Sequence, residues 1–459
     1  MIKFGTDGWR AVIGREFTEE NVARVAKAHS EVLKERGLKR VFVGYDWRFG
    51  SERFAQIVAF VMRSEGIDVV LSGTPCTTPV VSYAVKYCEY ENGVMITASH
   101  NPADYNGYKI KESFGGSATA DFLRDVEKRI EADAPSVNFS GTVSKKEISE
   151  EYIRAVRAQV DMSLLREREL LIVHDAMHGT SSGLLHRALE GTKTSVVGLR
   201  SWRDPLFGGN PPEPVERNLG VLCQKVRSMG GDLGVANDGD GDRVAFVDEM
   251  GRFVNSQVVY ALLLLHLLRD RGHRDGVVVK TVSTTFLADR ICSSEGVEIK
   301  EVPVGFKNIN EVVLREKVLF GGEESGGYGF PAFLPERDGL LSALMIIEMI
   351  LARGKTLSEI IGDLFREFGT AYFRRIDRPA EEKTKALIKE MSQSPPSAVG
   401  GKRVREVITV DGLKLVFEDD SWLLMRPSGT EPLIRIYAES PDLKGLEKLL
   451  EDAGRIIGV

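Results

Sequence analysis

The sequence predicts an α/β protein that ends in a smaller unit of α+β character. Apolar runs of strand length alternate with amphipathic, helix-length segments through most of the chain, as in parallel sheets covered by helices. Beyond about residue 370 short strands follow one another, which favours an antiparallel sheet. The chain has 459 residues, of which 42% are hydrophobic, so it has enough apolar material for several cores.

The first α/β unit shows this alternation up to a boundary expected around 140–150. Its first helix is predicted over 18–36, with Thr18 as the N-cap and two glutamates in the first turn. The apolar run 94–96 predicts a buried strand. The other elements expected here are strands at 40–44 and 67–71 and helices near 52–65 and 119–132.

Three further units follow. The second is expected to open with a helix at 148–160 and a strand at 169–174 and to close with a strand at 243–248. The third, from about residue 250, has expected helices at 256–271, 338–353 and 356–366 and strands at 276–280 and 317–320. The last has expected strands near 371–377, 406–410, 413–417, 421–425 and 433–438 and helices near 381–392 and 442–456.

Directly after the predicted strand 94–96 lies the string Thr97-Ala98-Ser99-His100-Asn101-Pro102. A hydroxyl held at the end of a rigid strand is where an α/β enzyme places a nucleophile or a phosphate carrier. Serines in such loops also serve only to satisfy backbone groups. Taken alone, the string leaves both interpretations of Ser99 open.

A second string, Asp238-Gly239-Asp240-Gly241-Asp242-Arg243, alternates three carboxylates with glycines. It begins like an EF-hand loop, and Glu249 stands at the twelfth position. However, Arg243 occupies the position that requires glycine, and residues 243–247 predict a strand, so we reject the EF-hand. Three carboxylates and a serine oxygen suit Mg²⁺, and a solvated acidic turn is the structural alternative.

Two more polar loops have ligand-binding composition. Gly322-Glu323-Glu324-Ser325-Gly326-Gly327 offers carboxylates and a hydroxyl, which suit a polyol such as a sugar. Arg426-Pro427-Ser428-Gly429-Thr430-Glu431-Pro432 offers backbone N–H groups to an anion, and Arg426 and Arg435 can grip phosphate oxygens with their planar guanidinium groups. Either loop alone is equally compatible with an ordinary polar turn.

Together, in this order and at these separations, the four strings resemble the α-D-phosphohexomutases: phosphoglucomutases, phosphomannomutases and phosphoglucosamine mutases. The resemblance covers residues 4 to about 439. It extends to Phe4-Gly5-Thr6-Asp7-Gly8-Trp9-Arg10, Val43-Gly44-Tyr45-Asp46-Trp47-Arg48, Asp104-Tyr105-Asn106-Gly107-Tyr108-Lys109, Asp204-Pro205-Leu206-Phe207-Gly208-Gly209 and Val304-Gly305-Phe306-Lys307.

The resemblance implies three similar mixed-sheet α/β domains, at 1–147, 148–249 and 250–367, and a smaller C-terminal α+β domain at 368–459. The four special loops, one from each domain, would meet in a central cleft. It also implies a reaction that interconverts a hexose 1-phosphate and a hexose 6-phosphate. The phosphoryl carrier would be a phosphoserine at Ser99, and a hexose 1,6-bisphosphate would be both intermediate and activator.

The same resemblance implies a role for each candidate residue. Mg²⁺ would be bound by Asp238, Asp240, Asp242 and a phosphate oxygen on Ser99, and Arg10 and Arg243 would stabilise the transferred group. Lys109 or His100 would be the general acid/base, and for a lysine this requires a pKa depressed by Mg²⁺ or arginine beside it. Lys307, Glu323 and Ser325 would contact the sugar. The distal phosphate would be held by Arg426, Ser428, Gly429, Thr430 and Arg435.

Composition limits the other possibilities. The formal net charge is −6 and no long basic tract appears, which argues against a nucleic-acid partner. The longest apolar stretch, 258–268, contains His266 and is too short to cross a membrane. The start of the chain does not resemble a signal peptide, and the four cysteines form no metal or C-x-x-C pattern, so we expect free thiols in the cytoplasm. The sequence gives no indication of the oligomeric state.

Two other classes of function, and the choice of sugar, remain to be weighed. A metal-dependent phosphatase with an aspartate carrier would need a D-x-D-x-[TV] loop after an early strand, which is missing. A sugar-phosphate sensor would have no use for a serine beside a metal site. Glu324 and Gly327 depart from the pattern of members that use both glucose and mannose phosphates, and together with Trp9 in the opening motif they favour glucose 1-phosphate. A mannose or dual-specificity mutase is the second choice, and a phosphoglucosamine mutase is the third.

Overall fold

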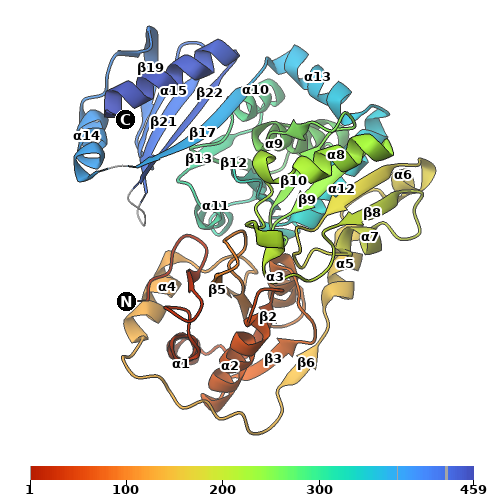
Figure 1. Cartoon of the computed structure of the whole chain (residues 1–459), viewed down its shortest axis with the longest axis vertical. Coiled ribbons are helices and arrows are strands. Elements are labelled where there is room, and N and C mark those ends of the chain that lie inside the picture. Colours follow the sequence, from red (N-terminus) through yellow and green to blue (C-terminus); the bar gives the residue numbers. More distant parts are fainter. Residues whose placement is uncertain (1, 380, 429–432, 459) are drawn as a thin grey trace.

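The computed structural model describes residues 2–379, 381–428 and 433–458, which form four sheets with flanking helices. In Figure 1 the N-terminal unit lies at the bottom and the C-terminal unit at the upper left, with the two middle units stacked beside each other. The three N-terminal sheets share one plan, in which parallel strands are followed by antiparallel strands at one edge. The fourth sheet is antiparallel throughout.

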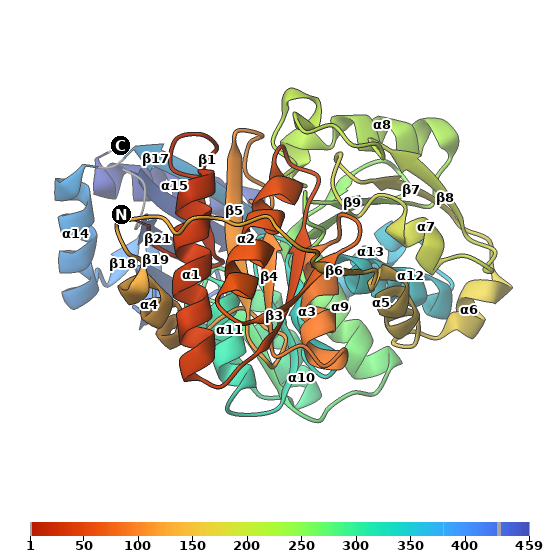
Figure 2. The same cartoon turned by 90° about the horizontal axis from the view of Figure 1, so that it is seen from below.

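The first sheet has the strand order β1-β5-β4-β2-β3-β6. Its strands are β1 (Trp9–Val12), β2 (Arg40–Tyr45), β3 (Asp68–Ser72), β4 (Asn92–Ile96), β5 (Tyr105–Lys111) and β6 (Ser144–Lys146). Its helices are α1 (Glu19–Glu35), α2 (Ser51–Ser64), α3 (Thr78–Tyr87) and α4 (Ala120–Arg129). Figure 2 shows α1 and α2 lying side by side over this sheet. The Thr18 hydroxyl accepts a hydrogen bond from the Asn21 N–H, which confirms the predicted N-cap.

The second sheet has the order β11-β10-β9-β7-β8. Its strands are β7 (Leu171–Asp175), β8 (Ser195–Leu199), β9 (Leu233–Asn237), β10 (Val244–Val247) and β11 (Phe253–Val254). Its helices are α5 (Ser149–Arg157), α6 (Met162–Glu167), α7 (Leu184–Ala188) and α8 (Gly220–Met229), with 3-10 turns η1 (Phe207–Gly209) and η2 (Glu216–Asn218).

The third sheet has the order β13-β12-β14-β15-β16. Its strands are β12 (Val277–Thr281), β13 (Ile299–Val302), β14 (Val318–Gly322), β15 (Tyr328–Phe330) and β16 (Leu334–Arg337). Its helices are α9 (Ser256–Leu265), α10 (Phe286–Glu295), α11 (Phe306–Val313), α12 (Gly339–Arg353) and α13 (Leu357–Phe368). The helix expected over 256–271 continues beyond α9 as the π-helical turn η3 (His266–Asp270).

The fourth sheet has the order β17-β22-β21-β20-β19-β18. Its strands are β17 (Tyr372–Pro379), β18 (Ala398–Val399), β19 (Lys402–Ile408), β20 (Leu413–Phe417), β21 (Trp422–Pro427) and β22 (Leu433–Ser440). Helices α14 (Glu382–Gln393) and α15 (Leu443–Ile457) cover one face. The antiparallel sheet predicted for this unit is confirmed.

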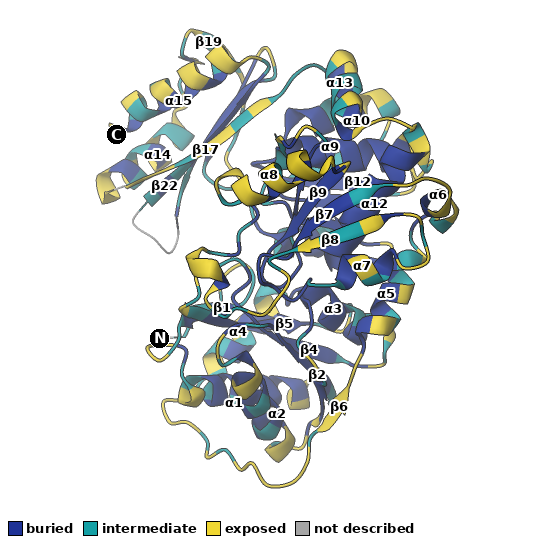
Figure 3. Cartoon of the chain, turned by 45° about the vertical axis from the view of Figure 1, so that its right-hand side comes forward, coloured by how far each residue is buried: buried dark blue, intermediate teal, exposed yellow. Residues whose placement is uncertain are grey.

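Burial is greatest where the units meet. One hydrophobic cluster takes in residues of all four units, from Phe42 on β2 to Tyr437 on β22. In Figure 3 the strands β7, β9 and β12 are dark blue, whereas the segment between α4 and β6 is largely yellow. The four units thus share one hydrophobic cluster. No helix in the described part of the chain is long and apolar enough to cross a membrane.

Candidate active site

Each of the four special loops begins at the end of a strand, as the sequence predicts. The Ser99 loop follows β4, the aspartate loop follows β9 and the loop at 322–327 follows β14. The fourth follows β21, but its residues Gly429 and Thr430 lie outside the described residues. In α/β sheets, ligands collect at such strand ends because side chains from several loops meet there.

Ser99 is fully buried and faces the aspartate loop. Its Oγ donates a hydrogen bond to Asp238 Oδ2 at 2.7 Å and lies 3.3 Å from His100 Nδ1. Its backbone φ of 53° lies in the left-handed region, which residues other than glycine rarely adopt. A Cβ atom at Gly239 would come within 2.5 Å of the Ser99 carbonyl oxygen, so this close approach of the two loops requires glycine.

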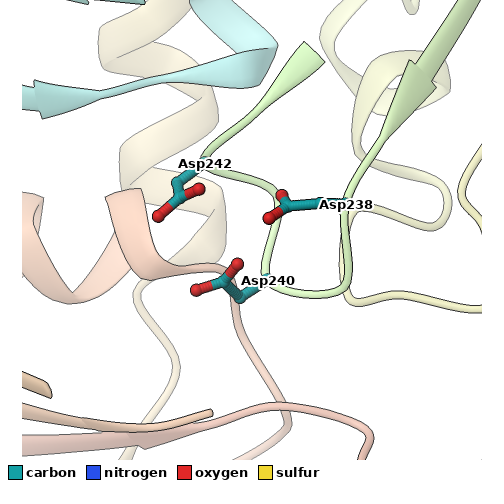
Figure 4. Close-up of side chains that lie close together, drawn as sticks. All are labelled: Asp238, Asp240 and Asp242. Carbon is teal, nitrogen blue, oxygen red and sulfur yellow. The ribbon is translucent and has the colours of Figure 1, made fainter. Parts of the chain in front are cut away.

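The three aspartates point their carboxyl groups into one shared space (Figure 4). All three are buried, and one ligand oxygen from each lies within 4.8 Å of the others. Burial and the neighbouring carboxylates raise the pKa of Asp238 well above its ordinary value. Asp240 Oδ1 and Asp242 Oδ1 are buried acceptors that have no hydrogen-bond partner among the described residues. Orphaned carboxylate oxygens of this kind are what a hard divalent cation satisfies, so the residues fit Mg²⁺.

Lys109 lies inside this carboxylate cluster. Its Nζ is 2.8 Å from Asp240 Oδ2, 3.0 Å from Asp242 Oδ2 and 2.8 Å from Asp7 Oδ2. Burial would lower the lysine pKa, but the three carboxylates outweigh it and raise the pKa above the ordinary value. A general base requires the opposite shift. Asp240 and Asp242 are also the predicted Mg²⁺ ligands, and a bound cation would oppose this shift, so the role of Lys109 as general acid/base stays a prediction.

His100 and Arg10 complete the surroundings of Ser99. Burial and the cations Arg243 and Arg10 hold the pKa of His100 well below its ordinary value, so the imidazole is neutral. Arg10 donates to Asn101 Oδ1 at 2.9 Å and to Asp7 Oδ2 at 3.2 Å. The structure thus brings both residues to the Ser99 loop. Arg243 is anchored by its backbone N–H, which donates to Asp238 Oδ1 at 3.1 Å.

Sequence reasoning missed Arg337, at the end of β16. This buried guanidinium donates to Asp7 Oδ2 at 2.6 Å and to Asp242 Oδ2 at 2.8 Å, and its NH1 lies 3.6 Å from Glu323 Oε2. It therefore joins the first, second and third units at the site. Thr78 was also missed, and its hydroxyl donates to Asp240 Oδ2 at 2.6 Å. Neither residue has a local pattern that would have singled it out, because both contacts join segments distant in sequence.

The predicted sugar loop lies next to this cluster through Glu323. Burial raises the pKa of Glu323 to about 7, although Arg337 opposes the shift. Glu323 Oε1 accepts the Gly305 N–H at 3.0 Å, which places the loop against the start of α11, where Lys307 lies in the first turn. Ser325 Oγ is buried and has no hydrogen-bond partner in the part of the chain that the structure describes. Glu323, Lys307 and Ser325 thus supply a carboxyl group, a cation and a hydroxyl from two neighbouring segments.

The predicted phosphate-binding arginines, Arg426 and Arg435, lie on the fourth sheet. Arg426 on β21 is directly opposite Arg435 on β22, and Asp377 on β17 is opposite Arg435 on the other side. Two like charges directly opposite each other are unfavourable unless an anion lies between them. Arg426 Nε donates to Asp411 Oδ2 at 2.7 Å, and Ser428 ends the described part of the loop with its N–H bonded to Leu433 O. This cationic face can hold a phosphate.

Comparison with known proteins agrees with this geometry. The chain matches the phosphoglucomutase/phosphomannomutase alpha/beta/alpha domains I, II and III at residues 1–136, 150–251 and 255–368 and the C-terminal domain at 377–454. It is 33% identical to a phosphoglucomutase/phosphomannomutase of Thermococcus kodakarensis over 98% of this chain and 96% of the relative. It is 34% identical to a Methanosphaera stadtmanae protein with the provisional name phosphoglucosamine mutase, over 97% and 96% of the two chains.

Among solved structures, the fold resembles that of a Thermus thermophilus protein with the provisional name phosphomannomutase. The TM-score is 0.90 at 35% identity, and the match covers 100% of this chain and 99% of the other. All four domain types are present in their usual order, and the relatives match over nearly their whole length. The chain therefore belongs to the phosphoglucomutase/phosphomannomutase family of intramolecular phosphotransferases, within the α-D-phosphohexomutase superfamily.

Proposed function

We propose that the protein interconverts hexose 1-phosphate and hexose 6-phosphate through a phosphorylated Ser99 and a hexose 1,6-bisphosphate. The observation that carries the proposal is the buried Ser99 hydroxyl, which lies 2.7 Å from Asp238 in a cluster of three aspartates. A phosphoryl carrier needs this combination of a hydroxyl, a cation site and shelter from water.

In the first half-reaction, the bond between phosphorus and Ser99 Oγ breaks while the free sugar hydroxyl forms a new bond to phosphorus. The sugar hydroxyl gives up its proton, and the leaving Ser99 Oγ takes one up. To balance the step, one base would accept the proton of the sugar hydroxyl and return it to the leaving Ser99 Oγ; Lys109, or His100 with Nδ1 at 3.3 Å from Ser99 Oγ, would be that base. In the second half-reaction, the other phosphoryl group of the bisphosphate returns to Ser99.

Asp238, Asp240, Asp242 and a phosphate oxygen on Ser99 would hold Mg²⁺, which neutralises negative charge on a transferred phosphoryl group. Lys109, Arg337 and Arg10 orient the surrounding carboxylates and add fixed positive charge. Glu323, Ser325 and Lys307 would bind the sugar. Arg426, Ser428, Gly429, Thr430 and Arg435 would hold the phosphate that is not reacting.

Glucose 1-phosphate is the substrate that we favour, from Glu324, Gly327 and Trp9. The names of the relatives support a second candidate, glucosamine 1-phosphate. A second carboxylate in the sugar loop is compatible with a cationic amino group. Glu324 Oε2 accepts a hydrogen bond from Ser283 Oγ at 2.7 Å, so it is partly satisfied within the protein. This single hydrogen bond leaves the second carboxylate oxygen available, so the kinetic comparison decides between the two sugars.

The test is a kinetic comparison of glucose, mannose and glucosamine 1-phosphates, each with Mg²⁺ and the matching bisphosphate, for wild type and Ser99→Ala. We expect the highest kcat/KM for glucose 1-phosphate and a loss of turnover by several orders of magnitude in the variant. A higher kcat/KM for another sugar would correct the preference and leave the mutase intact. Wild-type turnover by Ser99→Ala, or release of inorganic phosphate instead of isomerisation, would overturn the function.

A further inference from the structure

Ser99 is held in its left-handed backbone conformation by a buried ion pair from another loop. Asp46 and Arg48 follow β2, and both side chains are almost completely inaccessible, at 1% and 0%. Their charged groups approach to 3.3 Å, from Arg48 Nε to Asp46 Oδ2. A buried ion pair is costly to desolvate, so its hydrogen bonds must be satisfied by the surrounding structure. In this protein those partners belong mainly to the Ser99 loop.

The Asp46–Arg48 pair holds both backbone groups of Ser99, the carbonyl directly through Arg48 and the N–H through Thr97. Arg48 NH2 donates to the Ser99 carbonyl at 2.6 Å, and the Ser99 N–H donates to Thr97 Oγ1 at 2.9 Å. Thr97 Oγ1 in turn donates to Asp46 Oδ2 at 2.6 Å. The terminal NH1 and NH2 groups of Arg48 also donate to the carbonyls of Asn101 at 2.6 Å, Pro102 at 2.7 Å and Tyr105, the first residue of β5, at 3.2 Å.

The second unit covers the free face of this guanidinium. The Phe207 ring lies against it, with Arg48 Cζ 4.7 Å from the ring centroid. Phe207 is itself buried and has a φ of 52°, which is a rare and strained conformation for an aromatic residue. The turn is held by Asp204, whose carboxylate accepts the N–H groups of Leu206 and Gly208 at 2.9 Å each.

We propose that Arg48, oriented by Asp46 and covered by Phe207, is a positioning residue that fixes Ser99 so that its hydroxyl points at Asp238. The inference rests on the proposed function, in which Ser99 carries the phosphoryl group. Two strained residues, Ser99 and Phe207, lie on either side of one guanidinium, and strain of this kind persists only where the surroundings impose it. The Arg48 side chain is 0% exposed and its hydrogen bonds go to backbone carbonyls, so it acts through the backbone of Ser99.

The test compares Arg48→Lys and Phe207→Leu with a matched control, Arg53→Lys. Lysine keeps the charge but cannot bind four diverging carbonyls or stack its head group on the ring. Arg53 forms an exposed pair with Glu19 and stacks on Phe139, so its replacement tests the general effect of an arginine-to-lysine change. The readouts are kcat, the dissociation constant for hexose 6-phosphate, the melting temperature, and the rate at which bisphosphate phosphorylates the enzyme, measured by intact mass.

For Arg48→Lys we expect kcat and the phosphorylation rate to fall together by about ten- to a hundredfold, because a small misplacement of a reacting group is costly. For Phe207→Leu we expect a loss of about two- to tenfold. The dissociation constant should stay within about threefold in both variants, because the sugar and the distal phosphate are bound by other units. Arg53→Lys should behave as wild type.

Three outcomes would overturn the inference while the proposed function stands, provided that Ser99→Ala is inactive. The first is a folded Arg48→Lys protein with wild-type kcat. The second is a parallel loss of kcat and substrate binding in Arg48→Lys, which would indicate a general structural role. The third outcome applies if Arg48→Lys fails to fold cooperatively. Phe207→Leu then decides, and wild-type kcat in Phe207→Leu would overturn the inference. A fully active Ser99→Ala would instead remove the proposed function itself.

Discussion

The Ser99 loop and the arginine face of the fourth sheet differ in how the fold holds them. Ser99 is fully buried, and groups from two other loops fix its backbone and hydroxyl. Arg426 is 15% exposed and is oriented by the Asp411 carboxylate. The first arrangement suits chemistry, which needs reacting atoms placed to within a fraction of an ångström. The second suits a group that must bind either end of a sugar phosphate. In the proposed mechanism, this difference would separate transfer of the phosphoryl group from holding of the other phosphate.

Asp411 connects the arginine face to the third unit. Asp411 Oδ2 accepts both Arg426 Nε at 2.7 Å and the Val304 N–H of the third unit at 3.0 Å. The third and fourth units make other contacts further from the site, such as the pairs of Lys414 with Glu301 and of Arg290 with Asp420. If transfer and holding are separate, substitutions in the two regions should change different kinetic constants.

The largest effect is expected at the metal site. Asp240→Asn removes one negative ligand from a hard cation, so we expect kcat to fall by about a hundredfold or more and the Mg²⁺ concentration for half-maximal activity to rise. Steady-state kinetics over a Mg²⁺ titration measures both. The matched control is Asp232→Asn, an exposed acid at the opposite end of β9. Full turnover of Asp240→Asn in excess chelator would contradict the metal assignment.

Arg426→Ala is expected to have the next largest effect, and in a different constant. A charge-assisted contact to phosphate is worth about 1.5–3 kcal/mol, so KM should rise about ten- to two-hundredfold. The bisphosphate should also escape more often, and added bisphosphate should partly restore turnover. The Mg²⁺ requirement should not change. Arg403→Ala is the control, since that arginine lies exposed on β19 of the same sheet. A changed Mg²⁺ requirement in Arg426→Ala would show that the two regions are not separate.

Asp411→Asn sharpens the comparison at the connection itself. Asparagine keeps an acceptor for one of the two donors but removes the charge that orients Arg426. We expect KM to rise about two- to tenfold, and kcat to change less than KM. The measurement is the same steady-state assay. A larger effect on kcat than on KM would mean that Asp411 couples closure of the fourth unit to the transfer step, contrary to the separation proposed above.

The smallest effect is expected outside both regions, at His266 in η3. Its Nε2 lies 2.8 Å from Glu348 Oε2 and its Nδ1 lies 2.9 Å from Asp270 Oδ2. Burial would lower its pKa, but these carboxylates raise it above the ordinary value. The charged histidine therefore stabilises the fold fully below about pH 6.5, and this contribution is lost as pH rises through the folded pKa. Arg271 and Arg353 pair with the same carboxylates.

We expect the melting temperature of wild type to exceed that of His266→Gln by about 1–3 °C more at about pH 6 than at about pH 9. Thermal unfolding of both proteins across this range checks it, with kcat of the folded variant as a control that should not change. An equal difference at both pH values would show that His266 is not charged in the folded protein.

The sequence predicts much of this architecture because the strong signals are local. Amphipathic periodicity located α1, α2 and α13, and the change to closely spaced strands marked the antiparallel fourth sheet. The segments that were missed have weaker local patterns. For example, β5 carries the buried lysines Lys109 and Lys111, which look like surface residues until they meet the carboxylates of Asp240 and Glu336.

The site shows the same division. Ser99 and the three aspartates could be singled out because each lies in a distinctive string after a strand. Arg337 and Arg48 could not be given roles, because their importance comes from partners far away in the sequence: Asp7 and Asp242 for one, and the Ser99 loop for the other. The carboxylates that raise the pKa of Lys109 could not be predicted for the same reason, since they come from two other segments, and the acid/base role of Lys109 stays a prediction.

The most direct test of the account follows the phosphoryl group itself. The enzyme is first treated with hexose 1,6-bisphosphate and then mixed with one equivalent of hexose 6-phosphate, and intact mass and peptide mapping are recorded before and after. The account predicts one phosphoryl group on Ser99 that leaves the protein at a rate at least equal to kcat as bisphosphate appears in solution. Normal mutase turnover with no phosphoryl group on Ser99, or with one on another residue, would contradict it.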